Sequence, residues 1–282
     1  MSLTNPPDLI RVRELQSRLG AQGRVLIDKA ADTSRALVAW LDRTLGRLMT
    51  GWMVLCGLAG LAKVATAPLP AHSGQQALIM LAPFLLIAFA PWLAYRLTSF
   101  CLDAGLLTRQ PAFRLAFLGR WRKLNAIEVR QNPVFGPTGL MASLVLGLLV
   151  NIPLRVIEFL MAVPAMASSA PSWGLVMFYA LAADSIVMSC AYMVCFVLAV
   201  RAAPLFPRMI LLVWVLDIMM QFAIAHAVAG SAPVPDAVTR SLSYLLFGNI
   251  KKVLISTVVW LPYILLSDRV NVTYRARCAA RL

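Results

Sequence analysis

The sequence predicts an all-α fold: a polytopic membrane bundle of six transmembrane helices, with both termini cytoplasmic and an N-terminal amphipathic helix. Three observations predict it. Of 282 residues, 60% are hydrophobic and only 13% are charged, whereas about a quarter of a soluble domain is charged. Apolar runs of about 20 residues recur, which is the length that crosses a hydrocarbon core of roughly 30 Å. The bases behind the net charge of +14 lie between these runs, so they indicate topology, and no nucleic-acid partner is expected.

Residues 1–46 are predicted to form a basic amphipathic arm. From Asp8 onward, leucines and valines repeat at helical spacing, and bases such as Arg11 and Arg18 occupy the opposite face. Basic amphipathic helices lie on anionic membrane surfaces or dock on partners. A solvated cytoplasmic helix that only sets the topology accounts for the pattern equally well. Arg11 and Arg18 are therefore candidate membrane-surface contacts, and the lipid bilayer is an expected partner.

Six apolar runs after the arm predict the transmembrane helices. They cover about residues 48–66, 76–100, 138–163, 173–200, 209–229 and 251–266. The first two helices form one unit, residues 47–101, and the last four form a membrane domain, residues 137–268. Gly51, Gly57 and Gly60 give the first helix a small surface on which another helix could pack closely.

The approach to the last span contains two prolines, Pro233 and Pro235. The polar stretch that follows them predicts a separate short amphipathic helix over residues 236–247, lying on the outer surface. In this interpretation Lys251 and Lys252 begin the last span and therefore lie near the outer interface.

The longest loop, residues 102–136, is basic. Phe113, Phe117 and Trp121 are interspersed with its bases, which predicts a second helix at the membrane interface. Three of these bases are predicted to contact the membrane surface: Arg120, Arg122 and Lys123. A second basic segment, residues 269–282, is predicted to be a cytoplasmic tail.

The distribution of the bases predicts the orientation. Of the 26 lysines and arginines, 21 fall on the side that holds both termini, and the loops of the opposite side hold only Arg240. Lys63, Lys251 and Lys252 lie near that opposite interface. Because cytoplasmic loops carry an excess of lysine and arginine, both termini are predicted to be cytoplasmic. We therefore expect a multi-pass protein of the bacterial inner (cytoplasmic) membrane.

Residues 136–275 carry three recognisable stretches. These are GPTGLMASLVLGLLVNIPLRV, RAAPLFPRMILL and, at the last span, WLPYILLSDRVNVTY. Together they resemble the bacterial domain-of-unknown-function family 2569, whose members are small inner-membrane proteins with four spans. The resemblance covers about half of the chain and leaves out residues 1–135 with their two additional spans. It implies an architecture and no mechanism, because the family has no established activity.

Two acidic residues fall near the middle of predicted spans. With a rise of about 1.5 Å per residue, Asp184 lies roughly 16 Å from the outer start of its span and Asp217 roughly 12 Å from the inner start of the next. A carboxylate facing lipid at the helix centre costs about 3 kcal/mol or more, so both should point inward. Such residues mark proton or cation paths, or else they are hydrogen-bonded groups that pin two helices together. The sequence leaves both interpretations open.

The third span carries a stripe of small and polar residues at every fourth position. Its members are Gly139, Ser143, Gly147, Asn151 and Arg155. The small residues predict close contact with another helix, and the polar ones would complete the stripe. Arg155 is predicted to lie near the outer boundary and to pair with Glu158, three residues further on. Asn151, Arg155 and Glu158 therefore join Asp184 and Asp217 as candidates for an intramembrane polar site.

No motif for catalysis, cofactor binding or metal binding is present, so the sequence predicts no catalytic residue, no cofactor and no metal site. The leading interpretation is a non-enzymatic scaffold or accessory subunit of a membrane complex, with protein partners in the membrane. The alternative is a small transporter or channel that uses Asp184 and Asp217. An enzyme that acts on lipid ranks third.

The predicted topology can be tested by labelling single added cysteines in intact cells. Cysteines at Gly74, Ala170 and Ser231 should react with an impermeant reagent from the periplasm, because all three lie in the base-poor loops. A cysteine at Gln110, in the basic loop, should stay unlabelled. The parent chain gives the background from its own five cysteines, and labelling at Gln110 would reject the orientation.

Overall fold

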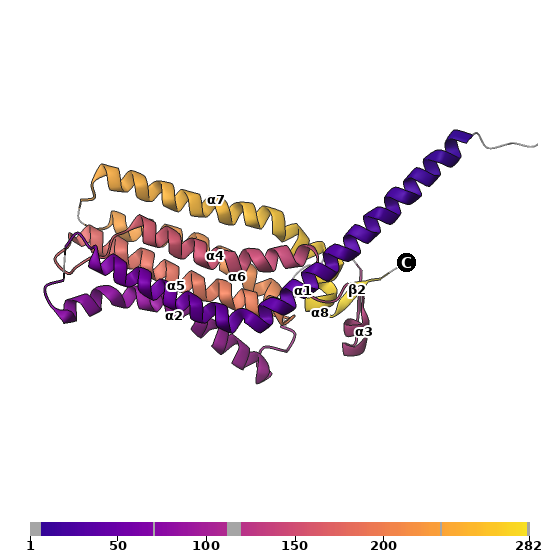
Figure 1. The fold of residues 1–282 in the computed structure, drawn as a ribbon, viewed down its shortest axis with the longest axis horizontal. Helices are drawn as coiled ribbons and strands as arrows, with labels where there is room; N and C mark the ends of the chain where they lie inside the picture. Colours follow the sequence, from indigo (N-terminus) through magenta and orange to yellow (C-terminus); the bar gives the residue numbers. More distant parts are fainter. Residues whose placement is uncertain (1–6, 70, 112–119, 232, 281–282) are drawn as a thin grey trace, which may run out of the picture.

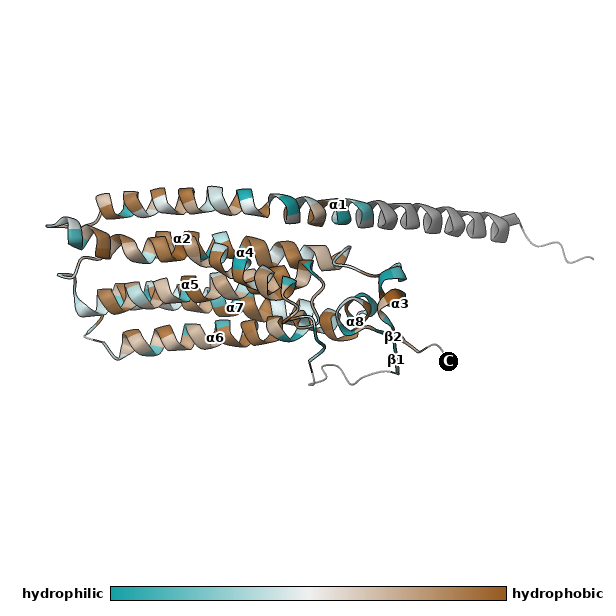
Figure 2. Cartoon of the chain, turned by 90° about the horizontal axis from the view of Figure 1, so that it is seen from below, coloured by the Kyte–Doolittle hydropathy of each residue, from teal (hydrophilic) through white to brown (hydrophobic). Residues whose placement is uncertain are grey.

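The computed structural model describes residues 7–280 apart from residues 70, 112–119 and 232, and side chains from residue 32 onward apart from residue 42. Six helices are long and apolar enough to cross a membrane, as predicted. They are α1 (Pro7–Ala65), α2 (Gly74–Asp103), α4 (Leu140–Ala162), α5 (Ser172–Val200), α6 (Phe206–Ala229) and α7 (Asp236–Leu266). Apolar residues predominate along the membrane-spanning parts of these helices (Figure 2). The chain is a multi-pass membrane protein by this architecture.

The arm and the first span form one continuous helix. α1 has 59 residues, and only its last part, Arg43–Ala65, is a candidate span. The arm is helical, as predicted, and Gly20 and Gly23 do not interrupt it, since a glycine costs a helix only about 1 kcal/mol. The helix extends beyond the rest of the bundle (Figure 1). The predicted surface contacts of Arg11 and Arg18 lie outside the described side chains.

Helix α5 lies at the centre of the bundle, where α2, α4 and α6 all pack against it. In an apolar stretch of 18 residues in α5, 67% of the residues are buried, whereas in the corresponding stretch of α7 only 17% are buried. Phe178 of α5 meets Phe84 of α2 and Phe159 of α4, with ring centroids 5.8 Å apart in both pairs. Aromatic pairs at this separation add to the stabilisation from burial. The core is therefore arranged around one helix.

The first span meets the second at a glycine. A Cβ added to Gly60 would lie 2.6 Å from Phe84 Cβ, so α1 can approach α2 closely only without a side chain there. The predicted close packing is confirmed at this position. At Gly51 and Gly57 an added Cβ would meet no described atom within 4 Å. The prediction was wrong for these two glycines.

The prediction of two helices between residues 236 and 266 was wrong. α7 is a single helix of 31 residues that starts directly after Pro235. A backbone break at Gly248 would leave amide groups unpaired inside the membrane, which costs several kcal/mol each. Its buried residues form a narrow stripe of Leu242, Leu246, Asn249, Val253 and Ile264. α7 therefore touches the bundle, chiefly α6, along one edge.

One end of the bundle carries a small cap, which we name the capped end. It holds α3 (Ala126–Gln131), α8 (Asp268–Arg275) and a two-stranded antiparallel sheet of β1 (Trp121–Lys123) and β2 (Arg277–Ala279). The N-terminal part of α1 and the last described residues lie at this end, as expected for six spans (Figure 1). The loops after α1, α4 and α6 lie at the opposite end, which we name the far end.

The cap corrects two predictions. Trp121–Lys123 is a strand where an interfacial helix was predicted, and the rest of that predicted helix, residues 112–119, lies outside the described residues. The predicted tail is instead packed structure, because Val270, Val272 and Tyr274 are buried. Pairing of β1 with β2 joins the loop to the tail across more than 150 residues of sequence.

Three bases around strand β1 lie at the surface. Arg120, Arg122 and Lys123 are all exposed, and their contact with a membrane surface stays a prediction. Arg122 also donates to Glu128 at 3.0 Å. The backbone N–H of Asn125 and then this guanidinium lower the pKa of the Glu128 carboxyl. The cap is thus ordered by local ion pairing and helix capping.

Tyr274 anchors the cap to the bundle, and its contacts lead to a prediction about stability. Its ring is fully buried 4.9 Å from the Phe206 ring, and its hydroxyl donates to the Ala199 carbonyl at 2.8 Å. Tyr274→Ala should lower the free energy of unfolding in detergent by about 3–5 kcal/mol, and Tyr274→Phe by about 1 kcal/mol. Tyr244→Ala, at a position that is 77% exposed, is the matched control and should change little. Equal effects at the two tyrosines would contradict this role.

Candidate functional site

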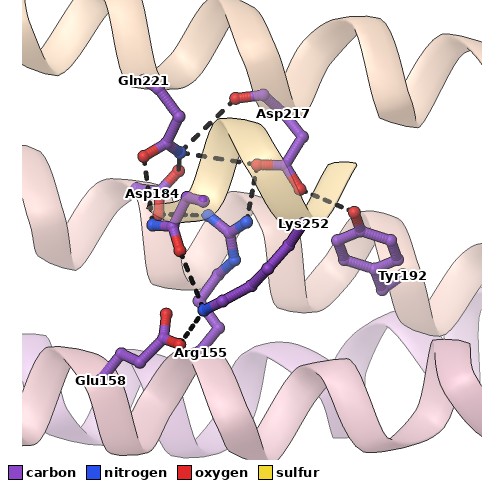
Figure 3. Close-up of polar contacts among 8 residues, drawn as sticks. Arg155, Glu158, Asp184, Tyr192, Asp217, Gln221 and Lys252 are labelled. Atoms are coloured by element: carbon purple, nitrogen blue, oxygen red, sulfur yellow. Dashed lines mark hydrogen bonds and ion pairs between the residues drawn. The ribbon is translucent and has the colours of Figure 1, made fainter. Parts of the chain in front are cut away.

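Eight polar residues meet in the middle of the bundle, and we call them the central network (Figure 3). They come from four helices, α4 to α7. Its members are Arg155, Glu158, Asp184, Tyr192, Asp217, Gln221, Asn249 and Lys252. All five residues predicted for an intramembrane polar site lie in this network or, in the case of Asn151, beside it.

Arg155 joins the two midplane acids. Its Nη1 donates to Asp184 Oδ2 at 2.5 Å, and its Nη2 donates to Asp217 Oδ1 at 2.6 Å. Arg155 is 6% exposed, Asp184 3% and Asp217 0%. Both carboxylates point inward, as predicted from the cost of facing lipid. One guanidinium therefore holds α4, α5 and α6 together through charged hydrogen bonds.

The predicted Arg155–Glu158 pair was wrong. Arg155 turns to the bundle interior, and Glu158 accepts a hydrogen bond from Lys252 of α7 instead. Two buried carboxylates on neighbouring helices stabilise a guanidinium more than one half-exposed neighbour on the same helix. The predicted position near the outer boundary was also misleading. A helical side chain leans toward its own N-terminus, which carries the Arg155 head group about a turn deeper.

Neutral donors bind the remaining oxygen of each of the two carboxylates. Tyr192 Oη donates to Asp217 Oδ2 at 2.6 Å, and Gln221 Nε2 donates to Asp184 Oδ1 at 3.2 Å. Each of the four carboxylate oxygens thus accepts a hydrogen bond. This arrangement is suited to two ionised acids around one cation, because an ionised carboxylate only accepts.

The network continues to the edge of the bundle through two amides. Lys252 Nζ donates to Asn249 Oδ1 at 3.3 Å, and Asn249 Nδ2 donates to Gln221 Oε1 at 3.2 Å. With the Gln221 bond to Asp184, all donors point the same way, from the ammonium to the carboxylate. The buried acid of α5 is therefore linked to the loosely packed helix α7.

Four members of the network were missed from the sequence. Gln221 could have been found, because it lies one turn after Asp217 on the same face of α6. Asn249 and Lys252 were hidden by the wrong start of the last span, which placed Lys252 at the interface. Tyr192 gave no signal, since a tyrosine in an apolar helix is ordinarily a packing residue.

The central network contains one more acid than base. Arg155 and Lys252 carry two positive charges, while Asp184, Asp217 and Glu158 carry three negative charges when ionised. An uncompensated charge inside a protein in a membrane costs several kcal/mol. Binding of one proton or one monovalent cation would make the network neutral.

A cavity of about 250 Å³ borders the network between α4 and α7. Asp217, Asn249 and Lys252 line it, and so do Asn151 and Gly147 of the small-residue stripe. The prediction that this stripe packs closely on another helix was wrong, since an added Cβ at Gly147 would meet no described atom within 4 Å. The reason is that α7 contacts α6 and leaves a space beside α4. The stripe forms a wall of this cavity.

A second cavity of about 800 Å³ lies toward the far end, between α4, α5 and α7. Its walls are mostly apolar and include Trp173, Met177, Leu242 and Leu245. Glu158 lines both cavities. We refer to them as the polar chamber and the apolar chamber.

Comparisons of the chain with protein-family models, with curated proteins and with solved structures found no match. The resemblance of residues 136–275 to domain-of-unknown-function family 2569 therefore stays a prediction. The candidate site is assigned from its own geometry.

Removal of the shared cation tests the electrostatic account of the site. Arg155→Met leaves two buried carboxylates without their charged partner, so it should lower the free energy of unfolding in detergent by about 3–5 kcal/mol. The same change in an Asp184→Asn/Asp217→Asn background should cost far less, because no charge is left unpaired. If Arg155→Met costs the same in both backgrounds, the ion pairs contribute nothing to stability.

Proposed function

We propose that the protein is a small proton-coupled membrane transporter in which Asp184 and Asp217 form the proton site. One observation carries this proposal: a buried network with one surplus carboxylate borders a cavity in the middle of the bundle. Intramembrane carboxylates commonly form proton relays in transporters. A network that only pinned helices together would be most stable with equal numbers of acids and bases.

Asp184 is the better acceptor of the proton. Its second oxygen is held by an amide N–H at 3.2 Å, whereas the second oxygen of Asp217 is held by the Tyr192 hydroxyl at 2.6 Å. The amide bond to Asp184 is the longer of the two, so Asp184 has the more loosely held oxygen on which a proton can be placed. When Asp184 takes the proton, Arg155 pairs with Asp217 alone and the three groups become neutral together.

Protonation of Asp184 also changes the amide chain. The new O–H donates, so Gln221 must present its carbonyl oxygen to it and its amide to Asn249. Asn249 then accepts from Gln221 with its carbonyl oxygen and turns its amide N–H groups toward Lys252. The Lys252 ammonium cannot accept a hydrogen bond from them. Lys252 is released from Asn249. Both residues belong to α7, so the change reorders the polar face that α7 turns toward the network, while Lys252 keeps its contact with Glu158 of α4.

A scaffold or accessory subunit is the second candidate function. It is supported by α1, whose continuous helix extends beyond the bundle and offers a surface to a partner (Figure 1). A scaffold needs the carboxylates only as fold elements, so it tolerates replacement by asparagine. The same variants therefore separate the two functions.

Proton binding inside a membrane moves charge, and this movement is measurable without a known substrate. A pH jump applied to proteoliposomes on a solid-supported membrane should give a transient current with the unmodified protein. Asp184→Asn and Asp217→Asn should abolish most of the current and keep the thermal stability in detergent, because the amide has the same size and still forms hydrogen bonds.

The control is Asp268→Asn at the exposed start of α8, outside the spans, which should leave the current unchanged. A normal current in both network variants would reject the transport proposal. Loss of the current only in proportion to lost folded protein would favour the structural role.

A further inference from the structure

The net charge around the polar chamber determines whether a cation or an anion can bind there. Both bases of the network are already paired, Arg155 with two carboxylates and Lys252 with Glu158. The surplus charge is negative. An anion would add a second unpaired negative charge to the same low-dielectric space, whereas a monovalent cation would cancel the first.

Aromatic rings make the polar chamber suitable for an organic cation. Tyr192, Trp214 and Trp260 line it together with Asp217 and Glu158. A cation within about 6 Å of a tryptophan face is attracted by the ring quadrupole, and more strongly when water is excluded. Aromatic faces beside carboxylates are a common means of binding organic ammonium groups.

The position of the two chambers indicates that the ligand also has an apolar part. The apolar chamber adjoins the polar chamber at Glu158 and has about three times its volume. The polar chamber lies between α4 and α7, and two of its lining residues, Val150 and Leu154, are half exposed on the side of an apolar span. A ligand that reaches this site sideways must be soluble in lipid. Its charged group would lie in the polar chamber and its hydrocarbon part in the apolar chamber.

We propose that the two chambers form one site for an amphiphilic monovalent organic cation, and that this cation and the proton exclude each other. This inference rests on the proposed proton site. Either positive charge neutralises the network, and both together would leave it positive in a membrane interior. Exchange of the cation for one proton follows from this exclusion.

The titratable and charged groups around the two acids come from three helices. They are Arg155 and Glu158 of α4, Tyr192 and Cys195 of α5, and Lys252 of α7. Helix α2 also packs on α5, and it contributes no titratable side chain between Gly74 and Ala94. One proton therefore accounts for the change in charge.

The experiment compares two probes of the same shape and opposite permanent charge, tetraphenylphosphonium and tetraphenylborate. Equilibrium dialysis against the full-length protein in lipid nanodiscs measures binding, and protein-free nanodiscs give the background. Tetraphenylphosphonium should bind more tightly as the pH rises, by up to about tenfold per pH unit, and should release one proton per bound probe. Tetraphenylborate should not bind above background.

Two variants locate the site. Asp217→Asn should weaken tetraphenylphosphonium binding by about tenfold or more and remove its pH dependence, because the surplus charge is gone. Trp260→Leu should weaken it by about two- to fivefold without changing the number of protons released. Trp40→Leu, in the part of α1 away from both chambers, is the matched control and should bind as the parent does.

The outcomes separate this inference from the proposed function. Equal or tighter binding of tetraphenylborate, or no binding of either probe, overturns the cationic ligand, and the pH-jump current still decides the proton site. Tetraphenylphosphonium binding that is independent of pH and releases no proton overturns the exchange. If the pH-jump current is also absent, the proton site itself is rejected.

Discussion

The ion pairs of Arg155 with Asp184 and Asp217 are the interaction on which the rest of the structure depends. Three charges lie where the surrounding helices offer almost only hydrocarbon, and each would cost several kcal/mol alone. They are tolerated because α4, α5 and α6 place the guanidinium nitrogens of Arg155 2.5 Å from an Asp184 oxygen and 2.6 Å from an Asp217 oxygen. The register of these three helices is fixed by this requirement as much as by the packing of their apolar side chains.

The bundle combines a tightly packed centre with a loosely attached edge. Most residues in the apolar part of α5 are buried, and Tyr274 anchors the cap to one end of the bundle. α7 is held by one stripe, which leaves the polar chamber beside α4. The amide chain of Asn249 and Gln221 links this edge to the buried acid of α5. These hydrogen bonds connect the charge at the centre with the polar face of α7.

The sequence predicts the parts of this structure that depend on composition and local period. Apolar runs located five of the six spans closely, and depth along them singled out Asp184 and Asp217. Local rules failed where distant segments decide. Arg155 was assigned to its neighbour Glu158, because nothing in the sequence shows that two acids face it from other helices. Lys252 was placed at the interface because the polar residues before it resembled a surface helix.

The cap shows the same limit. β1 and β2 are three residues each and pair across the length of the membrane domain. Strands this short have no period to detect, and their pairing depends on contacts that only the folded bundle creates.

Infrared difference spectroscopy of the carbonyl stretch tests the surplus carboxylate most directly. The account predicts a protonated carboxylic acid band that disappears as the pH rises and that is absent from the Asp184→Asn/Asp217→Asn variant. A spectrum in which every carboxyl of the network stays ionised throughout the pH range where the protein is folded would contradict the account.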